Sequence, residues 1–252
     1  MSSPAQDHHQ RCTVMGCGRP TMRAVGVGLG TALCKYHVER RARHGSPFAP
    51  PIKATDLRPY VKTALAWIQE RQKTDPTIGH VLQCLDGLLW GSGGGGPAPR
   101  ASDIKGRSPK YRAKVAFMRL HAAEVPPARL LAVHLGMAAC IEDDREAHRI
   151  PEFRIVQTAK ALHRLASGTH WRWEMPLPNG NTAPAELHVY PRSSGQVLRF
   201  MGEEVEEICR AVTERDRDAI RQRKQEKYGP HPSHMPGWRP TWQRKLLATR
   251  GY

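Results

Sequence analysis

Four side chains near the N-terminus have the types and the spacing of a metal site. Four residues separate Cys12 from Cys17, two separate Cys34 from His37, and 16 lie between the two pairs. Zinc prefers such thiolate and imidazole ligands in a tetrahedron, with sulfur at about 2.3 Å and nitrogen at about 2.0–2.1 Å. Because four protein ligands leave no open position for a substrate, the pattern predicts a structural Zn²⁺. Three unrelated thiols and a histidine are the alternative, which the clustering of half of the six cysteines disfavours.

The residues around these ligands predict how the chain folds over the metal. Gly16 permits a tight turn just before the second cysteine, and the Cys34–His37 spacing suits the first turn of a helix. The glycine-containing segment between the pairs is long enough for a short hairpin. Knuckle, hairpin and helix in this order predict a treble-clef zinc finger, whose folding free energy comes mostly from metal binding because the module is small.

Three stretches of this segment resemble a known short finger. They are Cys12-Thr-Val-Met-Gly-Cys-Gly-Arg-Pro20, Leu33-Cys-Lys-Tyr-His37 and Arg40-Arg-Ala-Arg-His-Gly-Ser-Pro47. Together they are similar to the Cys-x4-Cys…Cys-x2-His treble-clef finger of phage and bacterial mobile-element proteins, which is often attached to HNH-type endonucleases and other DNA-binding proteins. The loop between the ligand pairs is longer here, and Thr31-Ala-Leu33 replaces the usual small-residue and glycine approach. The resemblance implies a DNA-associated finger and covers about 36 residues, 12–47. The remaining residues resemble no protein family that we recognise.

The charge distribution favours a polyanionic partner. The net charge is +16, with seven basic and two acidic side chains in residues 1–51 and ten and four in residues 211–252. Each phosphate that Lys or Arg neutralises releases condensed counterions, so such a surplus favours nucleic acid. A basic proteome or a solvated basic surface is the alternative. The helix after the second ligand pair is predicted to contact phosphates through Lys35, Arg40, Arg41 and Arg43, and a solvated helix face is the other interpretation.

Composition also bounds the location of the protein. The N-terminus lacks the apolar core of a signal peptide, and no stretch approaches the ~18 apolar residues of a membrane span. The uneven cysteine spacing is unlike a secreted disulfide framework. We therefore expect a cytoplasmic, nucleoid-associated protein with reduced thiols and no membrane contact. The sequence leaves a protein partner or a homodimer open.

The chain divides into five parts by composition. We expect a zinc-finger domain and linker over 1–51, a helical pair over 52–90, a Gly/Pro-rich linker over 91–106, a helical body with a β-hairpin over 107–228, and a basic Pro- and Trp-containing tail over 229–252. Thr55 is a candidate N-cap for the first helix of the pair. Asp75-Pro76, Ser108-Pro109, Pro126-Pro127 and Pro151 are predicted helix starts.

After Gly168 the period of apolar residues changes from helical to alternating. Strands are expected over 171–175, 186–190 and 196–200, with Asn179-Gly180 as the hairpin turn, and one helix over about 203–227. The fold class is therefore mainly α with a small β-hairpin or meander. The order of elements over 108–200 matches a winged helix-turn-helix in outline, although a helical bundle with an attached hairpin explains it equally. In the winged interpretation the basic contacts would be Arg154, Lys160 and Arg164 on the recognition helix and Arg172 and Arg192 near the wing.

These observations predict a zinc-stabilised DNA-binding protein without catalytic activity, a regulator or accessory factor of phage or mobile-element origin. An HNH-like nuclease or recombination component is the first alternative. It would need a general-base histidine, an asparagine and a metal-binding histidine, and His188 with Asn179 or Asn181 approximates that set in the wrong order. An RNA-binding ribonucleoprotein subunit is the second alternative. Cys84, Cys140 and Cys209 lie on apolar helical faces and are predicted to be buried.

Overall fold

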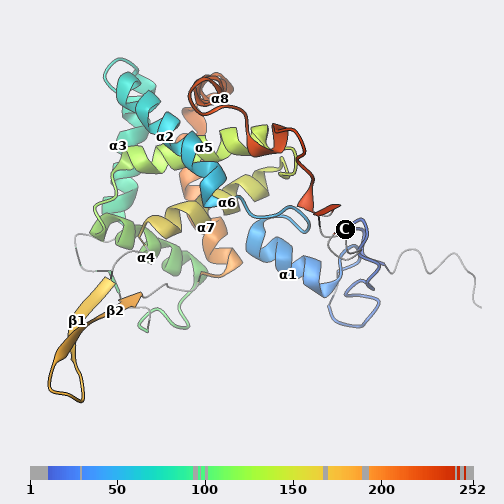
Figure 1. Ribbon diagram of the computed structural model, residues 1–252, viewed down its shortest axis with the longest axis horizontal. Coiled ribbons are helices and arrows are strands. Elements are labelled where there is room, and N and C mark those ends of the chain that lie inside the picture. Colours follow the sequence, from blue (N-terminus) through green and yellow to red (C-terminus); the bar gives the residue numbers. More distant parts are fainter. Residues whose placement is uncertain are drawn as a thin grey trace, which may run out of the picture.

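The computed structural model describes residues 11–28, 30–92, 96, 98–99, 102–166, 170–188, 193–241, 243–244 and 247. Within these residues the chain forms eight α-helices and one two-stranded sheet, which confirms the mainly α prediction (Figure 1). The elements are α1 (Lys35–His44), α2 (Ala54–Arg71), α3 (Pro76–Gly91), α4 (Pro109–Ala122), α5 (Pro127–Asp143), α6 (Pro151–Leu165), β1 (His170–Pro176), β2 (Thr182–His188), α7 (Gly195–Ile208) and α8 (Glu214–Tyr228), with 3₁₀ turns η3 (Cys209–Ala211) and η4 (Pro232–His234).

Helix α5 is the centre of the hydrophobic core. Every residue from 130 to 141 is buried, and α2, α3, α6 and α8 pack around it. Helix α2 crosses α5 closely at Gly136, where an added Cβ would lie 2.9 Å from the backbone nitrogen of Val61. Trp67 and Tyr60 of α2 are fully buried in the same core as Phe117 of α4. The helices of 52–90 and those of 107–228 therefore contribute to one packed unit, across the glycine-rich connection between them.

Local capping explains where most helices begin. The carboxylate of Asp75 accepts hydrogen bonds from the backbone N–H groups of Thr77 and Ile78 at the start of α3. The Ser108 hydroxyl accepts one from Tyr111 at the start of α4, and α5 and α6 each begin with a proline, as predicted. The predicted cap at Thr55 is wrong: α2 begins at Ala54, and the Thr55 hydroxyl donates to Asp56 instead.

Strands β1 and β2 form an antiparallel hairpin that projects from the helices (Figure 1). Trp173 pairs with Ala185 in the register, and Asn179-Gly180 forms the turn. Gly180 has φ +80°, a left-handed conformation that glycine adopts without strain, and the Asn179 side chain accepts from the N–H of Asn181. The predicted hairpin turn is confirmed, with β2 beginning at Thr182, earlier than expected.

The predicted third strand at 196–200 is wrong, because this segment opens α7. The Ser194 hydroxyl accepts from the N–H of Val197 as an N-cap, and Val197, Leu198, Met201 and Val205 are buried at helical spacing. The sheet described is consequently a hairpin and not a meander.

The single helix predicted over 203–227 is also wrong. Helix α7 ends at Ile208, the 3₁₀ turn η3 follows, and α8 starts at Glu214. Thr213 and Asp216 form a capping box that starts α8 as a separate helix, because such a box satisfies N–H groups that are free at a helix N-terminus.

The helices of the described chain lack the length and apolar character that crossing a membrane requires. None of the six cysteines is in a disulfide. Cys140 and Cys209 are buried as predicted, whereas Cys84 is half-buried, with its sulfur 3.5 Å from Nε2 of His80.

Candidate metal centre and basic surface

The four predicted ligands converge on one point. The ligand atoms of Cys12, Cys17, Cys34 and His37 all lie within 4.8 Å of one another. Nδ1 of His37 is 3.2 Å from Sγ of Cys12 and 3.4 Å from Sγ of Cys34, and the Cys17 and Cys34 sulfurs are 3.8 Å apart. A tetrahedron with zinc-type bond lengths has sulfur–sulfur edges of about 3.8 Å and sulfur–nitrogen edges of about 3.5 Å. The cluster could therefore hold a metal ion.

Backbone hydrogen bonds hold the first ligand pair in place. The N–H of Cys12 donates to the carbonyl of Arg19 and that of Cys17 to Val14, which closes the loop between the two cysteines. Gly16 and Gly18 on either side of Cys17 have φ +74° and +61°, conformations that favour glycine. The second pair comes from a helix start: Cys34 is the N-cap residue of α1, and the N–H of His37 donates back to its carbonyl. Between the pairs, the described residues contain no assigned strand, and the Arg11–Pro20 pairing is a single β-bridge.

Burial and neighbouring groups shift the pKa values of the ligands in different directions, and burial is the main cause that raises the pKa of the Cys17 thiol. Burial, with the positive charges of Arg19 and Arg40, lowers the pKa of His37, so the imidazole is neutral and Nδ1 is free to bind metal. Burial alone would raise the pKa of the Cys34 thiol, but the backbone N–H of His37 and the neighbouring thiols outweigh it and lower that pKa. The site is thus closed, largely buried and composed of soft donors.

A basic surface adjoins the metal ligands at the N-terminal end of α1. The guanidinium of Arg19 lies over the Tyr36 ring, 4.9 Å from its centroid, and Arg11 donates to the carbonyl of Gly18 beside it. Lys35 precedes Tyr36 and is exposed. We call Arg11, Arg19, Lys35 and Tyr36 the finger face. Three cations at a helix N-terminus leave this face strongly positive, because the helix dipole has the same sign there.

The arginines in the middle of α1 serve a different purpose. Arg40 donates to the carbonyl oxygens of Phe48 and Ala49, and Arg41 forms two hydrogen bonds, of 3.0 and 2.9 Å, with the Glu152 carboxylate of α6. Arg199 of α7 donates to the other Glu152 oxygen and to the carbonyls of Arg41 and Ala42. We call these contacts of α1 with α6 and α7 the seam. Of the predicted phosphate contacts on α1, Lys35 and Arg43 are exposed without a carboxylate partner among the described residues.

The basic residues predicted on a recognition helix lie on α6, which is mostly covered. Only Pro151 and Arg164 are exposed along this helix. Arg154 forms an ion pair with Glu206 of α7. Lys160 donates to Nδ1 of His44 at 2.6 Å, and burial next to Arg164 and Arg40 lowers its pKa to about 8. Arg164, although exposed, also interacts with another part of the chain.

The remaining predicted contacts fall at the hairpin. Arg172 pairs in β1 with Glu186 of β2 through the backbone, and its side chain lies outside the described atoms. Arg192 lies outside the described residues, as does the side chain of His188, on which the nuclease alternative depends.

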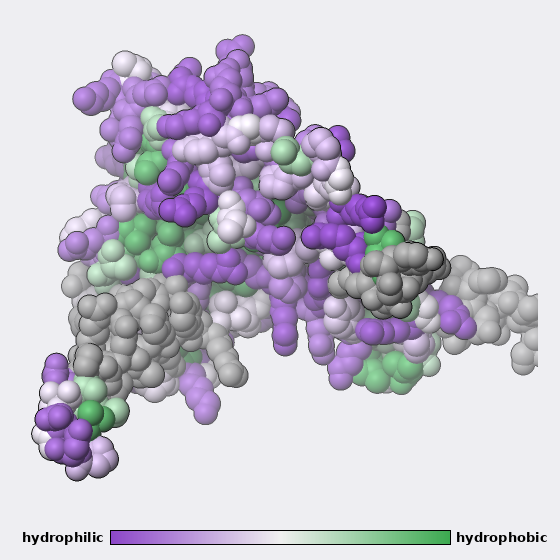
Figure 2. Space-filling view, in the orientation of Figure 1, coloured by the Kyte–Doolittle hydropathy of each residue, from purple (hydrophilic) through white to green (hydrophobic). Residues whose placement is uncertain are grey.

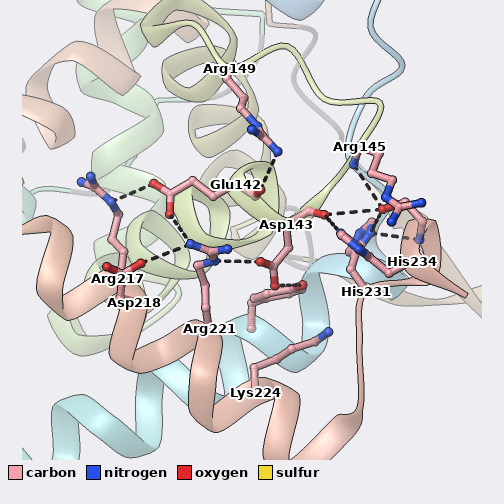
Figure 3. Close-up of polar contacts among 12 residues, drawn as sticks. Glu142, Asp143, Arg145, Arg149, Arg217, Asp218, Arg221, Lys224, His231 and His234 are labelled. Atoms are coloured by element: carbon pink, nitrogen blue, oxygen red, sulfur yellow. Dashed lines mark hydrogen bonds and ion pairs between the residues drawn. The ribbon is translucent and has the colours of Figure 1, made fainter.

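A network of ion pairs at the end of α5 was missed by sequence reasoning (Figure 3). The Asp143 carboxylate accepts from the Tyr60 hydroxyl at 2.8 Å and from Nε of Arg221 at 2.7 Å. Glu142 pairs with Arg217 at 3.0 Å. Acidic side chains near a helix C-terminus interact unfavourably with the helix dipole. The acidic run at residues 142–144 therefore indicates that cations from another element pair with it. The arginines of α8 supply them.

The first part of the tail, residues 229–241, binds to this network. His231 and Ser233 are buried, the Ser233 hydroxyl accepts from the N–H of Arg145, and His234 donates to the Asp143 carbonyl at 2.7 Å (Figure 3). Thr241 donates from its N–H and its hydroxyl to the carboxylate of Glu146. The tail residues described are thereby attached to α5.

The geometry thus provides a closed Cys₃His centre, a positive finger face and a seam that joins them to the helical body. Compared with models of protein families, with curated proteins and with solved structures, the chain matches none.

Proposed function

We propose that the protein binds DNA without catalysing a reaction on it, with a structural Zn²⁺ that maintains the finger in a treble-clef arrangement. The observation that carries this proposal is the position of the finger face beside a closed Cys₃His cluster. Three thiolates and one imidazole favour zinc over the harder divalent cations, and four protein ligands occupy the tetrahedron, so the metal acts as a brace.

The exposed cations are suited to phosphate. Arg19, Lys35 and Arg43 are exposed, and Arg23 lies between the ligand pairs, also exposed. Cations without an internal partner keep their full charge for phosphate oxygens, whereas Arg41 and Arg154 would have to give up carboxylates first. We therefore assign the phosphate contacts to the exposed set. A regulator or accessory factor of a phage or mobile element remains our interpretation of the biological role.

Salt-dependent binding tests this proposal. We expect purified protein to contain one zinc ion per chain and to bind a labelled duplex at about 50 mM salt, with log Kd rising linearly with log salt concentration. Replacing two phosphate contacts in Lys35→Gln/Arg43→Gln should reduce that slope by about 2, by the relation of about 0.9 per phosphate. Lys62→Gln/Lys73→Gln, which removes two exposed charges from α2 and the turn after it, is the matched control.

Two results would contradict the proposal. One is the absence of salt-sensitive affinity for duplex DNA at low salt in the zinc-loaded protein. The other is an equal loss of slope in both double variants, which would mean that total charge, and not the positions of Lys35 and Arg43, determines binding. Tighter binding to RNA in competition with the duplex would assign the function to the ribonucleoprotein alternative.

A further inference from the structure

A depression of about 200 Å³ lies between α3, α4 and α7, on a different part of the chain from the finger. Gly87 and Gly91, one turn apart on α3, form its floor, and Phe200 of α7 and Lys110 and Lys114 of α4 stand around it. A Cβ at either glycine would meet no atom within 4 Å, so open space lies directly above the α3 backbone. Figure 2 shows hydrophobic residues gathered over the α3 and α4 part of this face among hydrophilic surroundings.

The depression combines an exposed aromatic wall with a flat floor. Phe200 is 38% exposed although it belongs to a well-packed helix. The lining thus offers an aromatic side chain and open glycine backbone to a flat group. Tyr111, which follows Lys110 in the first turn of α4, is 41% exposed, with the guanidinium of Arg107 5.8 Å from its ring centroid.

The charged residues that line the depression are two lysines and one glutamate. Residues 104–123 contain six Lys and Arg and no Asp or Glu. In the described part of the chain no carboxylate forms an ion pair with Lys110 or Lys114, and Glu204 is the single acidic residue that lines the depression. Lys110 lies in the first turn of α4, which has no acidic residue, so the helix dipole adds to its charge. These lysines differ from Arg41 and Arg154, whose charges carboxylates neutralise.

We infer that this depression is a second nucleic-acid site, which takes an unpaired nucleotide with its base against Phe200 over the Gly87–Gly91 floor and its phosphate at Lys110 and Lys114. The inference rests on the proposed function and extends it from duplex DNA to single-stranded segments. Bases stack on aromatic side chains whatever their sequence, while lysines follow the backbone phosphates. An acidic peptide would satisfy the lysines but leave the flat apolar space unfilled.

The test compares binding to a labelled oligothymidylate of about 15 nucleotides with binding to a duplex, for the full-length, zinc-loaded protein. Gly87→Leu fills the floor without changing charge and should weaken single-strand binding about 5- to 150-fold, the loss of one stacked base. Gly79→Leu, on the same helix and with nothing within 4 Å of its added Cβ, controls for the effect of leucine on helix α3. Lys110→Gln/Lys114→Gln should weaken single-strand binding further than the Lys62→Gln/Lys73→Gln control.

The outcomes separate this inference from the proposed function. If Gly87→Leu binds the oligothymidylate as tightly as the unaltered protein while duplex binding persists, the second site is wrong and the finger proposal stands. If single-strand binding is lost as expected but Lys35→Gln/Arg43→Gln leaves duplex binding unchanged, the second site stands and the assignment of duplex contacts to Lys35 and Arg43 is wrong. If polyglutamate binds in a manner that Gly87→Leu abolishes and the oligothymidylate does not bind, the site takes acidic peptide and the inference is overturned.

Discussion

The close approach of α1 to α6 makes Gly45 the most informative position for a stability experiment. Gly45 ends α1 with φ +77°, and a Cβ there would lie 2.6 Å from the carbonyl oxygen of Glu152 and 2.8 Å from the Cα of Phe153. These are backbone atoms at the start of α6, so no change of rotamer relieves the contact. In Gly45→Ala we therefore expect α1 to move away from α6, with weakening of the Arg41–Glu152 hydrogen bonds across the seam.

Two effects contribute to the expected loss of stability. A residue with a Cβ in the left-handed region costs roughly 1–2 kcal/mol, and the smaller entropy of unfolded alanine offsets about 0.4–1 kcal/mol of this. Forcing extra volume into a packed contact costs about 1–3 kcal/mol. The sum is about 1–5 kcal/mol in the free energy that holds α1 against the body, of which the contact contributes the larger part.

Gly237→Ala isolates the first effect. Gly237 has the same φ of +77°, and nothing lies within 4 Å of an added Cβ. Each variant is compared with the unaltered protein. The amide hydrogens of α1 in Gly45→Ala should be accelerated about 5- to 150-fold more than the amide hydrogens next to residue 237 are in Gly237→Ala, which corresponds to the contact contribution of about 1–3 kcal/mol. Equal acceleration at the two sites would refute the reasoning, because α1 would then not be pressed against the α6 backbone.

Four further predictions concern other parts of the molecule. Asp143→Ala should lower the free energy of unfolding by about 3 kcal/mol, because the Tyr60 hydroxyl and Arg221 lose their partner. The control Asp218→Ala, which removes the exposed partner of Arg221, should lower it by less than about 1 kcal/mol. Urea unfolding of both variants checks this. Burial lowers the pKa of His134 to about 4, so the folded state binds fewer protons than the unfolded state and stability falls as the pH drops below 6.5. His134 should contribute about 2 kcal/mol of the loss between pH 7.5 and 5, so the loss should be smaller by that amount in His134→Gln; a loss of the same size in both proteins would contradict this. Cys17→Ser should lower the content of bound metal and make residues 11–34 sensitive to protease. The helical circular dichroism signal should persist, because the hydrophobic core cluster contains no residue before Ala49. Hydrogen bonds from Arg199 and Arg41 lower the pKa of Glu152 in spite of its burial, so the seam should weaken as the pH falls below about 4.5. In Glu152→Gln the protection of α1 amides from exchange should not vary with pH in this range.

The features that sequence reasoning predicted correctly are local. The ligand spacing of Cys12, Cys17, Cys34 and His37 places pairs of donors within one turn each, and the structure needs only to bring two such pairs together. The helix starts at Asp75 and Ser108 depend on side chains two or three residues from the amide they bind. Interactions of this range can be recognised from a window of a few residues.

The wrong assignments arose where a short window fits two structures. Residues 196–200 contain only five positions, in which apolar residues satisfy the periods of both a strand and a helix. The decisive residue lies outside the window, because Ser194 caps a helix whose buried residues continue to Val205. Likewise, the single helix predicted over 203–227 is two helices. The capping box of Thr213 and Asp216 starts the second of them, and charge patterning alone does not reveal it.

The charge pattern of a sequence does not show which cations form ion pairs in the fold. The assignment of phosphate contacts depends on that distinction. Arg41 and Glu152 are 111 residues apart in the chain and Arg154 and Glu206 are 52 apart, so nothing near either arginine in sequence announces its partner. Once these pairs are known, the predicted contacts separate into cations that hold the fold and cations without a carboxylate partner, such as Lys35 and Arg43. An arginine that already binds a carboxylate must lose that partner before it can bind phosphate, and the seam would open in exchange. Affinity for nucleic acid is therefore expected to depend on the exposed set, and mutation of Arg41 or Arg154 to act first on stability.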